Sequence, residues 1–388
     1  MKGDAILKVR IMLEEFVEII ESGDHNGNNR IFRHRLSSGR EIIGLATENF
    51  YGGDWDLGPT WNYIVGPERP FLLDTGRYGM GGRLLEMMGR AGMKGGDLDF
   101  ALISHGHEDH DGGLMEIVAK TGVRVKAQAL YDRLIRIYPQ DAPSSFKEAF
   151  SASCWHCFMP ESFTQVHCLE YHKKRNELQI EGIADSDTSL GEGVQVYHLP
   201  GHSPDSLALL IDKEAILVGD IVLPEITPHP SQEAFFKITE KVISPQHRQA
   251  QTFYGLKAYL RSLKRLKEIG QEHPHLLVLP GHRLFYNNQW HEIDLRVRVA
   301  EVIEHHIQRG GDILTILKDG PRTPEEVARR HFDPKLLKGF GINLAVSEIL
   351  SHAEFLLSSR DLLWQEDGSL LGLGSYHFEK IIRDEMGG

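Results

Sequence analysis

The stretch "SHGHEDHDGG", residues 104–113, sets the architecture and carries the densest chemistry of the chain. From His105 to His110 it holds three histidines and two acids, and only Gly106 among these residues lacks a side chain that could bind a metal. An apolar run, residues 100–103, precedes the cluster. This pattern predicts a buried strand that delivers a rigid loop to the edge of a sheet.

The residues that follow predict an α/β unit. After the glycine pair, Leu114, Ile117 and Val118 have the spacing of one face of a short helix, which we expect to end at Gly122. Residues 123–128 then alternate as a strand does. The order strand, loop, helix, strand is typical of α/β sheets, in which ligands collect at the carboxyl ends of strands.

The same pattern recurs three times, each time with a potential metal ligand directly after an apolar run. His202 follows in "LPGH", Asp220 in "LVGD" and His282 in a second "LPGH". A charged aspartate next to a buried apolar strand is costly unless it is paired or binds a cation. We therefore expect Asp220 to contact a positive charge.

The spacing within the cluster predicts more than one metal ion. His105 and His107 are two residues apart, so both imidazoles can turn toward one ion, while Asp109 and His110 point elsewhere and suit a second ion. With His202, Asp220 and His282 this makes seven candidate ligands. A catalytic zinc site typically uses three protein ligands and leaves a position for water, so seven are too many for one site and enough for two that share Asp220.

These motifs resemble the metallo-β-lactamase superfamily. Its signature H-x-H-x-D-H with a following glycine pair matches residues 105–113, and its later motifs match in order at His202, Asp220 and His282. The upstream "WNYIVGPERPFLLDTG", with Asp74 in its last turn, resembles the family's first strand pair. The resemblance spans roughly residues 60–285. It implies an αββα sandwich with metals at one edge, and the aspartate in "LVGD" is closer to the glyoxalase II-like branch than to the antibiotic-hydrolysing one.

The resemblance also implies a role for each ligand. His105, His107 and His202 would bind the first ion, Asp109, His110 and His282 the second, and Asp220 would bridge them. A hydroxide shared by the ions would attack the substrate, and Asp109 would orient it and pass a proton to the leaving group. Imidazole and carboxylate suit zinc, iron and manganese, and we expect two divalent ions, zinc first among the candidates. Asp74 is expected to support a metal-bound histidine rather than bind metal.

A separate cluster holds all three cysteines. Cys154 and Cys157, followed by Cys168 and His172, have the spacing of a structural four-ligand zinc site. The alternative is that these are reduced thiols in a lid-like insertion, and the sequence favours neither.

Composition narrows the class of protein. The net charge of -12 provides no global basic field for nucleic acid, which makes a small-molecule substrate the expected partner. No apolar stretch approaches the roughly 18 residues of a membrane span, so no membrane partner is expected. Three cysteines in 388 residues argue against a disulfide framework, and we expect a cytoplasmic protein.

The chain divides by pattern into two parts. Residues 1–283 are predicted to form the catalytic domain, with lid insertions near 131–190 and 224–274, and residues 284–388 a mostly helical domain. Within the second part we expect a long helix broken at a Gly-Gly pair, a helix capped by Thr323, a further helix and a hairpin turning at Asp367-Gly368. This order resembles the winged-helix-like tail of some superfamily hydrolases. We expect it to pack on the catalytic domain, or to help enclose substrate and form a homodimer.

Two functions follow from the expected centre. The first is hydrolysis of a carboxylic thioester, ester or lactone, and the second is phosphodiester or RNA cleavage by the same two ions. The acidic balance of the chain favours the first.

Overall fold

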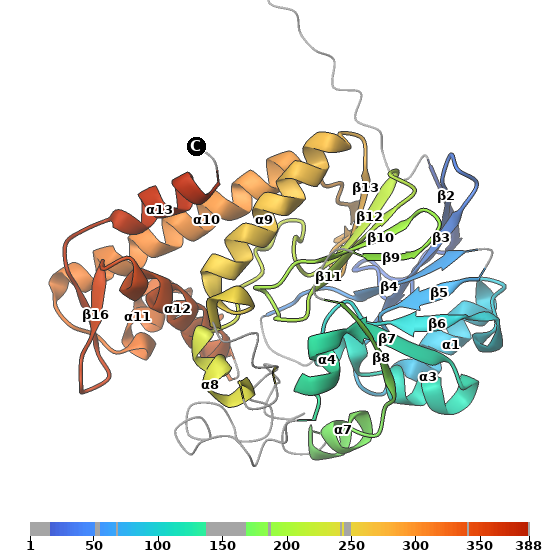
Figure 1. The fold of residues 1–388 in the computed structure, drawn as a ribbon, viewed down its shortest axis with the longest axis horizontal. Helices are drawn as coiled ribbons and strands as arrows, with labels where there is room; N and C mark the ends of the chain where they lie inside the picture. The colour runs from blue at the N-terminus through green and yellow to red at the C-terminus, as the bar shows by residue number, and fades with distance from the viewer. Residues whose placement is uncertain are drawn as a thin grey trace, which may run out of the picture.

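The computed structural model describes residues 16–50, 55–66, 69–136, 168–184, 188–240, 243, 250–339 and 341–386. Two β-sheets lie face to face at its centre, and helices cover the outer face of each (Figure 1). This is the αββα sandwich that the motifs predict, extended by a helical C-terminal region. Among the described helices, none has the length and apolar character needed to cross a bilayer.

The first sheet has eight strands in chain order. β1 to β5 run antiparallel, and β5 to β8 pair in parallel. Its strands are β1 (Val17–Glu21), β2 (Ile31–Arg35), β3 (Glu41–Thr47), β4 (Thr60–Gly66), β5 (Phe71–Leu73), β6 (Phe100–Leu102), β7 (Arg124–Gln128) and β8 (Ile180–Ile183).

The second sheet has five strands in the order β13-β12-β11-β10-β9. Its strands are β9 (Thr188–Gly191), β10 (Val194–His198), β11 (Leu207–Ile211), β12 (Ala215–Gly219) and β13 (Leu277–Pro280). β12 and β13 pair in parallel, so both present their carboxyl ends at the same edge. Two short hairpins, β14 (Phe285–Tyr286) with β15 (Gln289–Trp290) and β16 (Leu362–Trp364) with β17 (Leu370–Gly372), complete the described strands.

Alternation along the strands divides the core into layers. In β6, Phe100 and Leu102 face the second sheet, whereas Ala101 packs toward the helices α1 (Gly81–Arg90) and α3 (Leu114–Thr121), as does Ile103 directly after the strand. A period of two is what a strand buried on both faces requires. The predicted strand is thus confirmed, and so is the helix that follows it, which ends at Gly122 with φ 67°.

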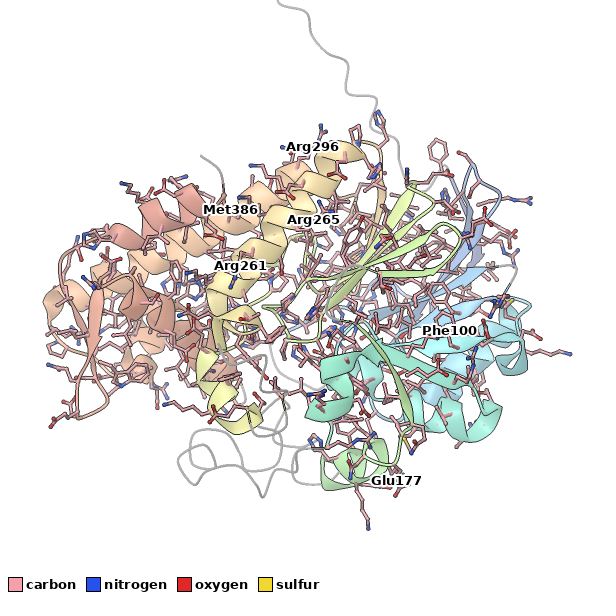
Figure 2. The ribbon with its side chains drawn as sticks, viewed as in Figure 1. Phe100, Glu177, Arg261, Arg265, Arg296 and Met386 are labelled. Atoms are coloured by element: carbon pink, nitrogen blue, oxygen red, sulfur yellow. The ribbon has the colours of Figure 1, made fainter. Side chains whose placement is uncertain are left out.

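The outer face of the second sheet packs on α9 (Gly255–Glu272). The apolar side chains of α9 in this core include Leu256, Tyr259, Leu260, Leu263 and Leu266. Arg261 is exposed (Figure 2). Arg265 lies over the ring of Tyr197. Apolar side chains of the C-terminal helices belong to the same core. The expected packing of the C-terminal region on the catalytic part is therefore confirmed, and the division at residue 283 stays a prediction.

The C-terminal helices are α10 (Leu295–Ile316), α11 (Pro324–His331), α12 (Gly341–Ser358) and α13 (His377–Glu385). Thr323 caps α11 in a reciprocal pair with Glu326, as its sequence predicts. The hairpin of β16 and β17 turns at Gly368, which has φ 83°. The order of helices and hairpin agrees with the prediction. The structure also contains α13, which the sequence analysis does not predict.

The predicted break at the Gly-Gly pair is wrong. α10 runs without interruption through Gly310 and Gly311. A Cβ at Gly310 would lie 2.6 Å from the Phe378 ring of α13, whereas Gly311 faces open space. Glycine at position 310 permits close helix packing, and the tertiary contact outweighs the lower helix propensity of the pair.

The two predicted insertions hold several short helices. They are α4 (Ala129–Leu134), α7 (Cys168–Arg175), a 3-10 helix η4 (Glu233–Phe235), α8 (Phe236–Thr239) and a second 3-10 helix, η5 (Ala250–Thr252). The structural zinc hypothesis depends on Cys154 and Cys157, which lie outside the described residues. Cys168 begins α7, and His172 is buried in that helix.

Candidate metal centre

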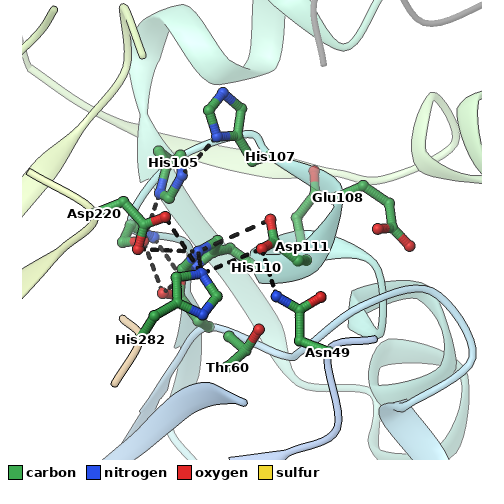
Figure 3. A network of polar contacts seen from close by, with 12 residues as sticks. Asn49, Thr60, His105, His107, Glu108, His110, Asp111, Asp220 and His282 are labelled. Atoms are coloured by element: carbon green, nitrogen blue, oxygen red, sulfur yellow. Dashed lines mark hydrogen bonds and ion pairs between the residues drawn. The ribbon is translucent and has the colours of Figure 1, made fainter. Parts of the chain in front are cut away.

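The seven predicted ligands meet at one edge of the sandwich. His105 and His107 lie on the loop after β6, and Asp109 and His110 lie in the one-turn helix α2 (Glu108–Asp111). His202, Asp220 and His282 follow β10, β12 and β13. Figure 3 shows His105, His107, His110, Asp220 and His282 turned toward one another. Carboxyl strand ends from both sheets therefore build the centre.

The first group contains three imidazoles. His107 Nδ1 lies 3.0 Å from His105 Nε2 and 3.2 Å from His202 Nε2. The three nitrogens together form a set that could hold a metal ion. It contains the residues that the sequence assigns to the first ion.

The second group combines a carboxylate with two imidazoles. His282 Nε2 lies 3.2 Å from Asp109 Oδ2 and 3.3 Å from His110 Nε2. These three residues form another set that could hold a metal. They are the residues that the sequence assigns to the second ion.

Asp220 lies between the two groups. Its Oδ1 is 3.3 Å from His110 Nε2, and its Oδ2 is 3.3 Å from His282 Nε2 and 3.9 Å from His202 Nε2. With His105 and His110 it forms a third overlapping set of ligand atoms. Its side chain is 7% exposed, and Oδ1 accepts no hydrogen bond from the residues that the structure describes. A buried carboxylate oxygen in this position suits a cation, as the sequence argument for Asp220 expects.

The outward nitrogens of the histidines fix the direction of their inward lone pairs. His202 Nδ1 lies 3.1 Å from the carbonyl oxygen of His229, and His282 Nδ1 lies 3.1 Å from that of Pro59. A carbonyl only accepts hydrogen bonds, so each Nδ1 carries a proton, and each Nε2 presents a lone pair to the centre when the imidazole is neutral, as it is in a metal-bound histidine. Ring nitrogens whose lone pairs face one another at 3.2 to 3.3 Å, as in the pairs His202–His107 and His282–His110, fit a metal ion.

Asp74 links the two groups from behind. Its Oδ2 lies 2.8 Å from His110 Nδ1 and accepts a hydrogen bond of 2.7 Å from Ser104 Oγ, while Oδ1 accepts one of 2.7 Å from the Ser104 amide. Ser104 Oγ in turn lies 3.0 Å from His105 Nδ1. Asp74 thus contacts a candidate ligand through its outward nitrogen, which is the supporting position expected from the sequence.

The two acids of the cluster that are not candidate ligands have other partners. Asp111 is buried and accepts hydrogen bonds of 2.8 Å from both Tyr131 and Arg175. Glu108 accepts a hydrogen bond from the backbone amide of Tyr78, and its side chain points away from the centre (Figure 3). Neither belongs to any of the potential metal-binding sets formed by the described residues.

Charge at the centre is unevenly distributed. Burial, followed by repulsion from neighbouring histidines, lowers the pKa of His105 and His107 well below the usual value, which keeps both imidazoles neutral and able to bind metal. Burial also opposes charge on His282, but Asp220 and Asp109 outweigh it and raise the pKa of His282 to about 9. The buried carboxylate of Asp220 and the partly buried one of Asp109 therefore attract positive charge to the second group, and a metal ion would supply it.

A pocket opens beside the first group. It encloses about 550 Å³ of space, part of it open to solvent. His107 and His202 of that group belong to its lining. The other lining residues are Gly106, Tyr131, Leu134, Ile135, Arg175, Ser203, Pro204, Asp205, His229, Ser231, Phe235 and Tyr254.

Sequence reasoning missed several residues of this region. Asn49 donates a hydrogen bond of 3.0 Å to Asp109 Oδ2 from 60 positions away, and no local pattern indicates it. His229, which the sequence analysis does not single out, lines the pocket, and its carbonyl oxygen accepts a hydrogen bond from His202 Nδ1. Asp205 could have been identified from the sequence, because it is an acid in the loop that presents His202 and a continuous apolar strand follows it.

Comparison with known proteins agrees with this architecture. Residues 55–282, more than half of the chain, match the family model of the metallo-beta-lactamase superfamily. The beta-lactamase-like protein 2 homolog of Drosophila melanogaster is 22% identical over 261 residues, which cover 66% of this chain and 70% of that protein.

Solved structures share the fold over most of the chain. A metallo-beta-lactamase family protein from Thermus thermophilus has a TM-score of 0.60 at 22% identity, covering 85% of this chain and 98% of its own. A beta-lactamase domain protein from Burkholderia ambifaria has a TM-score of 0.54 at 18% identity, covering 88% of this chain and 92% of its own. At such identities the likeness concerns the fold.

Proposed function

Because the chain belongs to the metallo-β-lactamase superfamily and is a hydrolase, we propose that it cleaves a carboxylic thioester, ester or lactone with two divalent ions, zinc first among the candidates. The observation that carries the proposal is the pair of ligand groups on either side of Asp220, with a pocket at His107 and His202. His105, His107 and His202 would hold one ion, Asp109, His110 and His282 the other, and Asp220 would contact both.

The bound ions would lower the pKa of water and polarise the carbonyl oxygen of the substrate. The protein's part is to position these groups and to move a proton. We assign the proton transfer to Asp109, which is only partly buried and whose Oδ2 is held by Asn49. Water forms the new bond to the carbonyl carbon, the bond to sulfur or oxygen breaks, and the proton passes through Asp109 to the leaving group.

The pocket walls support an acyl substrate. Leu134, Ile135 and Phe235 give it an apolar side, which suits a carbon chain. A phosphodiester chain would need an array of basic side chains. Among the described residues that line the pocket, Arg175 is the one arginine, and it pairs with buried Asp111 at 2.8 Å.

The test is metal content and turnover in the same preparations. Protein reconstituted with zinc, manganese or ferrous iron would be assayed with acyl-CoA and acyl-glutathione thioesters, lactones, bis-p-nitrophenyl phosphate and single-stranded RNA. We expect two ions per chain and turnover of an acyl substrate, both reduced in His110→Ala and Asp220→Ala but not in a control variant of the exposed His275. Turnover of the phosphodiesters alone would contradict the substrate class, and full metal content with full activity in His110→Ala would contradict the centre.

A further inference from the structure

A buried carboxylate stands in the wall of the substrate pocket, outside both ligand groups. Asp205 is 2% exposed and lines the pocket next to His202 and Ser203. Its Oδ1 accepts a hydrogen bond from the Ser203 hydroxyl. Among the residues that the structure describes, no other residue donates a hydrogen bond to Oδ2. Oδ2 is not fully buried, so a hydrogen-bond donor in the pocket can reach it.

The position of Oδ2 places it close to the candidate metal centre. A Cβ at Gly106 would lie 3.1 Å from Asp205 Oδ2 and 3.2 Å from the ring of Tyr131. Gly106 separates His105 from His107, so Asp205 packs over the loop that carries the first ligand group. A molecule in the pocket would therefore meet the carboxylate and the metal-binding edge together.

Neighbouring side chains leave the negative charge of Asp205 poorly balanced. Arg175 makes its ion pair of 2.8 Å with Asp111 rather than with Asp205. The hydroxyl groups of the two tyrosines in the pocket are also directed elsewhere, Tyr131 to Asp111 and Tyr254 to Thr239. Burial accordingly raises the pKa of Asp205 to about 6, which still leaves the group mostly ionised at neutral pH.

We propose that Asp205 determines substrate specificity by binding a protonated amine of the substrate. The inference rests on the proposed hydrolytic function and adds the chemical class of the substrate, an acyl compound with an ammonium group. Such a group would donate to Asp205 Oδ2 and balance its charge, and the aromatic rings of Tyr131, Tyr254 and Phe235 would surround it with surfaces that favour cations.

The experiment compares substrates that differ only in that charge. β-Alanyl and butyryl 4-nitrophenyl esters form a pair matched in size on the acyl side, and 4-(aminomethyl)phenyl and 4-ethylphenyl acetates form one on the leaving-group side. We expect the metal-loaded protein to prefer the amine of at least one pair by about 10- to 100-fold in kcat/KM, mainly through KM, as a charge-assisted hydrogen bond would give. Acetylation of that amine is expected to abolish the preference.

The Asp205→Asn variant is expected to reduce the preference to about one, because a carboxamide carries no charge. Asp212→Asn is the control, since Asp212 pairs with Arg40 and lies outside the pocket. Calorimetric binding of β-alanine against butyrate gives a second readout that needs no turnover. Turnover of the esters without any preference for an amine, or a preference retained in Asp205→Asn, would overturn this inference alone. If no ester is turned over, equal binding of β-alanine and butyrate would overturn this inference, whereas the proposed function falls only if the thioesters and lactones are not turned over either.

Discussion

The support of the candidate metal ligands by Asp74 gives a prediction with a definite size. Asp74 accepts hydrogen bonds at three places, from the amide and hydroxyl of Ser104 and from His110 Nδ1, at 2.7 to 2.8 Å. Asp74→Asn replaces one oxygen by an NH₂ group of nearly the same shape. If that group faces the Ser104 amide, two donors oppose each other. If it faces His110, Nδ1 must accept, and the proton moves to Nε2, the atom that faces the metal.

Either arrangement is expected to weaken metal binding by about 10- to 100-fold, or about 1.4 to 2.7 kcal/mol, since loss of a partner behind a ligand histidine typically has this effect. The affected group should be the one that contains His110. Competition with a chromophoric chelator measures the two affinities separately. Ser104→Ala provides the comparison, because its hydroxyl also reaches His105 and its loss should affect the other group as well.

The distant Asp212→Asn variant controls for the general effect of removing a paired charge. Its partner Arg40 belongs neither to the ligand sets nor to the pocket lining among the described residues. Two outcomes would refute the reasoning on Asp74. One is wild-type affinity for both ions in Asp74→Asn, and the other is selective loss of the ion bound by the three histidines.

Three further predictions concern stability. Removal of bound metal by a chelator should lower the free energy of unfolding by about 4 kcal/mol for each ion present at about 1,000 times its Kd. The decrease should be smaller in His110→Ala, which is expected to bind metal more weakly. Thermal unfolding with and without chelator measures both decreases. Gly310→Ala should destabilise the protein by about 1 to 3 kcal/mol, because the new methyl group meets the Phe378 ring. Gly311→Ala, in open space on the same helix, should stabilise the protein by about 0.5 to 1 kcal/mol. Equal effects of the two substitutions in denaturant unfolding would contradict the packing argument. Burial raises the pKa of Glu354 to about 8, so the folded state binds the carboxyl proton more tightly than the unfolded state. The free energy of unfolding should therefore fall as pH rises from about 4.5 to 8. Unfolding curves of Glu354→Gln, measured over this range, should lack that part of the pH dependence.

The candidate ligands could be predicted because each breaks a local rule. Asp220 is a charge beside an apolar strand, and the histidines after β6, β10 and β13 follow runs that only a buried strand explains. Such conflicts between a residue and its surroundings concentrate at functional sites. The seven residues come together because carboxyl ends of strands meet at one edge, which topology alone dictates.

Other features depended on contacts between distant segments. The sequence predicted a helix break at Gly310 because the low helix propensity of glycine is a local property, whereas the Phe378 ring that requires glycine there lies 68 positions along the chain. The hydrogen bond from Asn49 to Asp109 is similarly nonlocal. Tertiary packing routinely overrides helix propensity, as it does at Gly310.

The C-terminal helix α12 connects this nonlocal packing to the pocket. The Glu354 carboxylate accepts hydrogen bonds of 2.7 and 2.9 Å from the backbone amides of Glu233 and Ala234, and Ser347 accepts one of 2.8 Å from Gln232. All three partners lie between Ser231 and Phe235, and those two residues line the pocket. The group of Asp109, His110 and His282 is supported elsewhere, by Asp74 behind His110 and by the Pro59 carbonyl oxygen behind His282. Ser231, by contrast, donates a hydrogen bond of 2.8 Å to the Gly201 carbonyl oxygen beside His202. Changes in α12 are therefore expected to alter the pocket wall and the three-histidine group together and to leave the second group in place.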